Sequence, residues 1–156
     1  MATSIQDELK QTRPFATLEE EVIVGLARTA DALQRGMGAV LRQAGLSPTQ
    51  YNVLRILRGA GAPGLACGEI VERMVTRDPD ITRLLDRLEA RRLVTRNRDG
   101  ADRRVVTSRI SQAGLALLDE LDDPLQTTIR RLLGHMGEGR LKSLAELLDE
   151  ARAAPG

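Results

Sequence analysis

The stretch between residues 78 and 110 constrains the fold more than any other part of the chain. It begins with the signals of a helix start, because Asp78 can cap the N-terminus and Pro79 suits the first helical position. Apolar side chains then recur with the i, i+3, i+4, i+7 spacing of one helix face, at Ile81, Leu84, Leu85 and Leu88. The pattern predicts a short amphipathic helix that packs through its leucines.

The opposite face of this helix is polar, because a rotation of about 100° per residue turns Thr82, Arg83, Asp86 and Arg87 away from the leucines. Arginine can read guanine bidentately in the major groove of DNA, and threonine can contact a thymine methyl group or a phosphate. The alternative is salt bridging along the helix, for example between Asp86 and Arg83. Both can hold together, since an acid can pre-position an arginine.

Two strand-like runs follow the helix, at residues 93–96 and 105–110, and both are rich in valine and threonine. Between them, residues 97–104 contain an Asp-Gly turn signal and three arginines, so the tip of the predicted hairpin is basic. A helix with a polar outer face followed by a basic hairpin is what a winged helix-turn-helix presents to DNA. The predicted fold class is mainly α, with a small β-hairpin wing.

Positive charge is concentrated in this region, although the 156-residue chain carries a formal net charge of only +1. Seven arginines and two aspartates lie between residues 91 and 109, whereas residues 111–150 contain eight acidic and four basic side chains. A local basic patch indicates a polyanionic partner at one defined place, and the alternative is a solvated charged surface. With one Tyr, one Phe and no Trp, the chain lacks the aromatic platforms of single-strand and RNA binders, and leucine must form its core.

The residues upstream predict the other helices of a helix-turn-helix. Residues 47–50 read as a capping box with proline in the first helical position, and the helix they open ends in the glycine-containing residues 59–64. Residues 65–67 form a short apolar run that suits an additional edge strand, and residues 68–74 read as a second short helix. A tight turn at residues 76–78 then leads into the amphipathic helix.

Leucine-rich helices flank this centre on both sides. Thr17 and Glu20 predict a capping box at the start of a helix that runs to about Gln43, and the apolar stripe resumes after the hairpin. Pro124 is expected to kink or restart the C-terminal helix, and residues 134–139 to break it. Packed against a second copy of the chain, these helices would form a dimerisation domain; the alternative is that they complete a monomeric core.

Four parts are therefore expected along the chain. They are a flexible N-terminal tail over residues 1–15, an N-terminal dimerisation helix over 16–45, the DNA-binding domain over 46–111 and C-terminal dimerisation helices over 112–156. No apolar run approaches 18 residues, so no membrane partner is expected. The polar, mixed-charge first fifteen residues do not resemble a secretory signal, and a single cysteine fits a cytoplasmic location.

Other classes of function have few residues to support them. The sequence contains no nucleophile elbow, no glycine-rich phosphate loop and no H-E-x-x-H pattern, so neither an enzymatic activity nor a cofactor is expected. His135, the single histidine, has no cysteine or second histidine with which to form a zinc site. Cys67, the single cysteine, reads as a small buried hydrophobe, with a redox sensor as the alternative.

The chain resembles the MarR family (multiple antibiotic resistance regulators) in four segments that follow one another with the family's spacing: LSPTQYNVLRIL, GEIVERM, DITRLLDRLEARRLVTR and DRRVVTSRISQAG. The likeness is close from Leu46 to Gly114. It implies a homodimer that binds a pseudo-palindromic operator, usually as a repressor. Many members of the family bind small phenolic or aromatic ligands and then release DNA. The chain departs from the family in three features. Arg92 stands where members commonly have glycine, aromatic side chains are scarce, and the N-terminal sensing cysteine of peroxide-responsive members is missing.

The resemblance also implies roles for individual residues. Thr82 and Arg83 match the recognition-helix pair that reads bases, Arg104 matches the wing arginine that enters the minor groove, and Asp102 matches the aspartate that stabilises the wing. The remaining expected contacts go mostly to phosphates, from Arg77, Arg87, Arg98, Arg103, Thr76 and Thr49. The alternative function is a winged-helix protein-interaction module that does not bind DNA.

Overall fold

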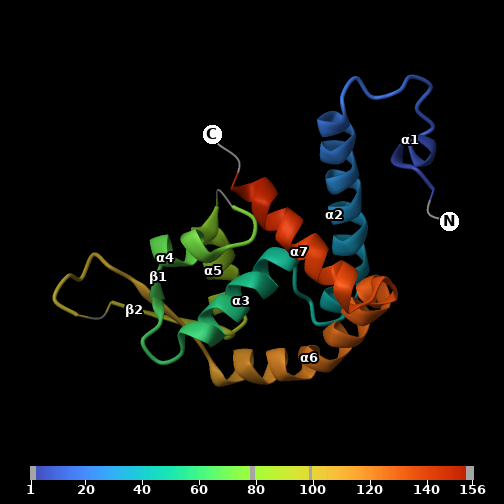
Figure 1. The fold of residues 1–156 in the computed structure, drawn as a ribbon. Coiled ribbons are helices and arrows are strands. Elements are labelled where there is room, and N and C mark those ends of the chain that lie inside the picture. Colours follow the sequence, from blue (N-terminus) through green and yellow to red (C-terminus); the bar gives the residue numbers. More distant parts are fainter. Residues whose placement is uncertain (1–2, 78–79, 99, 154–156) are drawn as a thin grey trace. The chain divides into compact units, whose positions relative to one another are not determined.

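The computed structural model describes residues 3–77, 80–98 and 100–153, which form helices and one small sheet (Figure 1). Contacts divide the chain into two units, Met1–Gly36 and Met37–Gly156. The first unit contains the short helix α1 (Ile5–Glu8), within the segment expected to be a tail, and most of helix α2 (Leu18–Gln43). Thr17 Oγ1 accepts a hydrogen bond from the Glu20 amide at 3.2 Å, as expected for the cap. The Glu20 carboxylate accepts from the Ala16 amide, one residue earlier than in a regular capping box.

The second unit contains the helix-turn-helix and the sheet. Its elements, in order, are α3 (Pro48–Ala60), β1 (Leu65–Ala66), α4 (Cys67–Arg73), α5 (Ile81–Ala90), β2 (Val94–Asn97), β3 (Thr107–Ile110), α6 (Gln112–Leu133), the 3-10 turn η1 (Gly134–Met136) and α7 (Glu138–Arg152). The capping box predicted before α3 is confirmed. Ser47 Oγ accepts from the Gln50 amide at 3.1 Å, and Gln50 Oε1 accepts from the Ser47 amide at 3.0 Å.

The N-terminal cap of α5 is Asp80, whose carboxylate accepts a hydrogen bond from the Arg83 amide at 3.3 Å. The sequence offers two aspartates at this helix start, and the expected cap, Asp78, lies with Pro79 outside the described residues. The helix therefore begins at Ile81, later than predicted, and the apolar face is unchanged by this shift.

The sheet has the order β1-β3-β2, with both pairs antiparallel, so the short run at residues 65–66 does add an edge strand to the wing. The second wing strand begins at Thr107, and the prediction that it begins at Val105 is wrong. The Val105 amide donates to the Asp102 carbonyl oxygen at 3.1 Å, which closes a turn where valine had favoured a strand. In the opposite direction, β2 extends to Asn97, which pairs with Thr107.

Helix α6 runs from Gln112 to Leu133 without interruption, so the restart predicted at Pro124 does not occur. Pro124 is exposed and removes one backbone donor, while the neighbouring Leu121 and Leu125 are buried and keep the helix packed on both sides of it. The helix ends at Leu133 and is followed by the turn η1, so the break predicted at residues 134–139 is confirmed.

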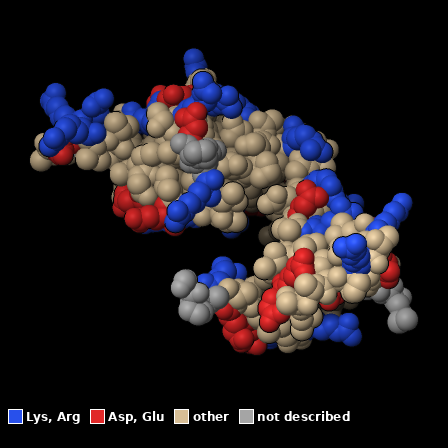
Figure 2. Space-filling view, turned by 90° about the horizontal axis from the view of Figure 1, so that it is seen from above, with Lys and Arg blue, Asp and Glu red and all other residues tan. Residues whose placement is uncertain are grey.

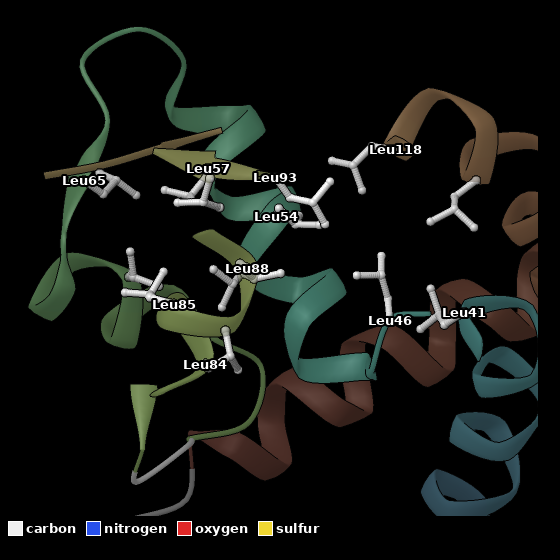
Figure 3. Close-up of a cluster of buried hydrophobic side chains, with 14 of the residues drawn as sticks. Leu41, Leu46, Leu54, Leu57, Leu65, Leu84, Leu85, Leu88, Leu93 and Leu118 are labelled. Carbon is white, nitrogen blue, oxygen red and sulfur yellow. The ribbon is translucent and has the colours of Figure 1, made fainter. Parts of the chain in front are cut away.

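Leucine forms the core of the second unit, as the shortage of aromatic residues required (Figure 3). Leu54, Leu57, Leu88 and Leu118 are fully inaccessible to solvent and come from α3, α5 and α6. The same cluster includes Leu41 at the end of α2 and Leu93 just before β2. One continuous core therefore positions the helix-turn-helix, the wing and the adjoining helix ends.

Candidate nucleic-acid interface

Helix α5 presents one polar face to solvent, because its leucines occupy the other. Leu84, Leu85 and Leu88 are buried. Thr82, Arg83, Asp86 and Arg87 are all exposed. The burial pattern predicted from the 3.6-residue period is confirmed, so the candidate reading residues point away from the core.

Arg83 remains available although it lies near an acid. Its Nε atom is 3.6 Å from Asp80 Oδ2, and its side chain is 69% exposed, so the pair is a surface interaction that a phosphate or base can replace. Asp86 does not pair with Arg83 as considered from the sequence, because its carboxylate is bound by Arg96. Most of the Arg83 side chain thus remains accessible to solvent.

Arg83 and Arg87 line a polar hollow of about 290 Å³ between the outer face of α5 and the N-terminal end of α3. Thr49 lies in the same hollow, beside the capping residues Ser47 and Gln50. Asp80 also lines the hollow and lies beside Arg83, so Arg87, next to the N-terminus of α3, is the arginine in it that best suits a backbone phosphate. The structure therefore brings Thr49, Arg83 and Arg87 together from two helices.

The tip of the wing carries a second group of cations (Figure 2), gathered at the left end of that view. Asp102 Oδ1 accepts from the Arg104 amide at 3.0 Å and from Arg104 Nε at 3.2 Å, and the Arg104 side chain is 92% exposed. Arg98 Nη1 donates to the Arg103 carbonyl oxygen at 2.8 Å. The tip is thus shaped by its own short-range bonds, which leave a guanidinium at the exposed end.

A guanidinium clamp joins the wing to α5. Arg96, on β2, donates from Nη2 to Asp86 Oδ1 at 2.5 Å and to Glu89 Oε1 at 2.9 Å. The hydrogen bond with Glu89 is the main cause that raises the pKa of Arg96, and the same bond lowers the pKa of Glu89. The sequence interpretation missed this clamp; the spacing of Asp86 and Glu89 on one side of the helix was its only local signal.

Thr76 and Arg77 are exposed in the turn between α4 and α5, as expected for phosphate contacts. The turn is held from α3, because Asn52 Oδ1 accepts a hydrogen bond from the Val75 amide at 2.9 Å. Asn52 is a second positioning residue that the sequence interpretation missed, since its partner is 23 positions away.

Cys67 is half-buried rather than fully buried, at the first position of α4. It lines a hollow of about 390 Å³ that also contains Thr82 of α5 and Arg104 of the wing. This hollow shows that the recognition helix and the wing tip approach each other around one space. Among the described residues, no group of three or more His, Cys, Asp or Glu side chains is placed to hold a metal ion.

Comparisons with known proteins agree with this geometry. A family model described as the MarR family matches residues 44–105. The crystal structure of a MarR transcription factor from Planctomyces limnophilus is 39% identical, covers 87% of this chain and 98% of its own, and superimposes with a TM-score of 0.67. The transcriptional regulator PecS of Dickeya dadantii is 26% identical over 148 residues, which are 94% of this chain and 89% of PecS.

The chain therefore belongs to the MarR family of helix-turn-helix transcriptional regulators. The structure of S. aureus MepR in a complex with DNA shares the fold, with a TM-score of 0.74 at 19% identity over 82% of this chain and 93% of that one. No helix in the described part of the chain is long and apolar enough to cross a membrane.

Proposed function

We propose that this protein is a transcriptional repressor that binds a pseudo-palindromic operator in double-stranded DNA as a homodimer. The observation that supports the proposal most directly is the hollow between α5 and the wing, because its lining includes both Thr82 and Arg104. A reading helix and a basic hairpin held at one site suit two adjacent grooves of a duplex. MepR, which has the same fold, was solved in a complex with DNA.

Each candidate residue receives a role from its position. Thr82 and Arg83 read base edges in the major groove, and Arg104 enters the minor groove, where the potential is most negative. Asp102 shapes the wing by holding the amide and Nε of Arg104. The remaining contacts go to phosphates, from Thr49, Thr76, Arg77, Arg87, Arg98 and Arg103.

The homodimer is supported by apolar side chains that one copy leaves exposed. On α2, Leu18 is 71% and Ile23 is 67% exposed, and on α7, Leu147 is 60% exposed. Val22 and Leu26 of α2 are exposed as well, at 50% and 40%, so together with Leu18 this helix leaves apolar side chains at the i, i+4, i+8 spacing of one face open to a partner. We therefore keep residues 16–45 and 112–156 as the dimerisation segments on either side of the DNA-binding domain, residues 46–111.

The protein acts by binding rather than by catalysis, and it works in the cytoplasm, where its operator lies. Its family relatives here are regulators, not enzymes. Release by a small ligand is part of the proposal as the family's usual form of control. A fluorescence-anisotropy screen of phenolic compounds against the operator complex tests it, and a complex that no compound dissociates contradicts it.

The wing assignment predicts the effect of Arg104→Ala. Loss of one minor-groove guanidinium weakens operator binding and flattens the slope of log affinity against log salt by about one unit. Anisotropy titrations at several salt concentrations measure both quantities. Arg13→Ala, which removes one exposed arginine from the N-terminal segment, is the matched control and leaves both unchanged. An Arg104→Ala variant with the affinity and slope of the unmodified protein contradicts the wing assignment.

The recognition helix predicts a different signature for Arg83→Ala. The variant loses about 1–3 kcal/mol of binding free energy on the operator and little on random DNA, because a base contact is specific. Anisotropy titrations of the variant and the unmodified protein on operator and on random DNA measure the two losses of binding free energy. Equal losses on both would make Arg83 a phosphate contact.

A simpler experiment distinguishes operator binding from the alternative function, a protein-interaction module that does not bind DNA. Gel shifts with DNA selected from a random pool are run at two salt concentrations. Selection of a two-fold symmetric site by the unmodified protein supports the operator. Failure to enrich any sequence supports the interaction module.

A further inference from the structure

Arg91 makes a long-range contact that the proposed DNA contacts do not use. This residue caps the C-terminus of α5, and its guanidinium reaches the chain just beyond α2. Nη1 donates to the Gly45 carbonyl oxygen at 2.6 Å, and Nη2 donates to the Ala44 carbonyl oxygen at 3.0 Å. The two sides of the contact are 46 and 47 positions apart in the sequence.

The end of α2 is a suitable acceptor for this side chain. Helix α2 closes on itself through the Gly45 amide, which donates to the Arg42 carbonyl oxygen, and the Leu46 amide, which donates to that of Leu41. The next carbonyls point beyond the helix, at its electronegative end. A planar guanidinium can bind two adjacent carbonyl oxygens at once, which the single ammonium of lysine cannot do with the same geometry.

The backbone at Gly45 turns in the left-handed region next to the contact. Its φ is +67°, and a Cβ atom built there would lie 3.4 Å from Arg91 Nη2. Glycine thus serves the left-handed turn that ends α2, and the Arg91 guanidinium lies in contact distance of this turn. Leu46, the next residue, is buried in the core, so the accepting segment is itself well anchored.

The recognition helix is therefore braced at two places by arginines with different partners. Arg96 ties α5 to the wing through Asp86 and Glu89. Arg91 ties the C-terminal end of α5 to the junction between α2 and α3. Both contacts of Arg96 lie within the DNA-binding domain, residues 46–111. The contacts of Arg91 instead join this domain to residues 44 and 45, which follow the helix that we assign to dimerisation.

We propose that Arg91 is a positioning residue that sets the spacing between the two recognition helices of the homodimer. A dimer that reads two half-sites needs its helices about one turn of DNA apart, roughly 34–36 Å. Without this contact, the packed helix α5 is no longer tied to the end of α2, so each protomer still reads its own half-site but the dimer tolerates a changed separation. The inference rests on the proposed operator function, because spacing has meaning only for two half-sites.

The test measures binding as a function of half-site spacing. An operator is selected with the unmodified protein, and versions are made with the half-sites one or two base pairs closer or farther apart. The unmodified protein loses about tenfold or more in affinity for a one-base-pair change, whereas Arg91→Ala loses about threefold or less. Arg91→Lys, which keeps the charge but not the two-carbonyl geometry, gives an intermediate profile. In both variants the affinity for an isolated half-site and the salt slope stay unchanged.

Three outcomes overturn the inference. The first is a spacing profile of Arg91→Ala that matches the unmodified protein. The second is a uniform loss at every spacing with a salt slope lower by about one, restored by Arg91→Lys, which would make Arg91 a phosphate contact. The third is an unmodified protein that selects no operator, which refutes the proposed function itself. Circular dichroism checks each variant, and if Arg91→Ala does not fold, Arg91→Lys decides by its spacing profile.

Discussion

The recognition helix and the wing tip face the same partner, but they are held in place by different forces. Helix α5 is anchored in the core by Leu84, Leu85 and Leu88, the last of which is 0% exposed. The wing tip has no such anchor in its described residues 100–104, all of which are exposed. Its shape depends on hydrogen bonds between near neighbours, such as those that the Arg104 amide and Nε donate to Asp102.

This difference fits two kinds of DNA contact. Reading a base edge requires donors held in a fixed geometry, which a packed helix provides. Insertion of a cation into the minor groove depends on electrostatic potential and groove width, and an exposed side chain on a hairpin can adjust to both. Arg96 joins the two regions, so the adjustable tip still begins from a defined place beside α5.

The largest expected effect on the free energy of unfolding comes from a substitution in the buried leucine face of α5. Leu88→Ala removes fully buried methyl groups and leaves a cavity under α5, so unfolding free energy falls by about 2–5 kcal/mol. Asp102→Ala, at the exposed tip, changes it by about 0.5 kcal/mol or less, although operator affinity falls. Urea unfolding followed by circular dichroism compares the two variants. Equal losses of stability would show that the wing tip is part of the cooperative core.

A smaller effect is expected where α5 passes into the wing. Arg92 has a φ of 59°, in the left-handed region that costs a non-glycine residue about 1–2 kcal/mol. Glycine removes this cost but loses more backbone entropy on folding, about 0.5–1 kcal/mol. Arg92→Gly should therefore raise unfolding free energy by about 0.5–1 kcal/mol, measured by urea unfolding.

Ala90→Gly is the matched control, because Ala90 ends α5 with helical geometry. There the substitution lowers unfolding free energy by up to about 1 kcal/mol. A destabilised Arg92→Gly variant would show that the arginine side chain contributes more than its backbone strain costs. The left-handed φ also gives a physical reason for the glycine that the family resemblance implies at position 92.

Much of the fold was predictable because its signals are local. The leucine spacing predicted which face of α5 is buried, and Ser47 with Gln50 predicted the start of α3. The errors arose where two local signals compete. Val105 favours a strand by residue type, but the turn closed by Asp102 prevails.

The positioning contacts were not predictable, because they join residues that no period relates. No positioning role was predicted from the sequence for Arg91, Arg96 or Asn52, and their partners lie 7 to 47 positions away. The candidate contact residues were found instead by exposure and charge, which follow from the helix period. Their roles in binding remain predictions that the DNA titrations test.

The clamp between the two regions can also be probed by pH, with Glu89→Gln. Because the hydrogen bond from Arg96 lowers the pKa of Glu89 below its ordinary value of 4.5, the native state binds the Glu89 proton less tightly than the unfolded state. Its contribution to stability is therefore complete above pH 4.5 and is lost as pH falls through the lowered pKa. The Glu89 side chain is 42% exposed, so screening limits the contribution to a few tenths of a kcal/mol.

Thermal unfolding at pH 3 and pH 7 should show a shallower loss of stability in Glu89→Gln than in the unmodified protein. In an Arg96→Ala background the same substitution should add nothing, because the partner that shifts the carboxyl group is gone. An undiminished effect in that background would assign the pH dependence to another contact and would leave the wing and the recognition helix joined mainly by backbone pairing and apolar packing.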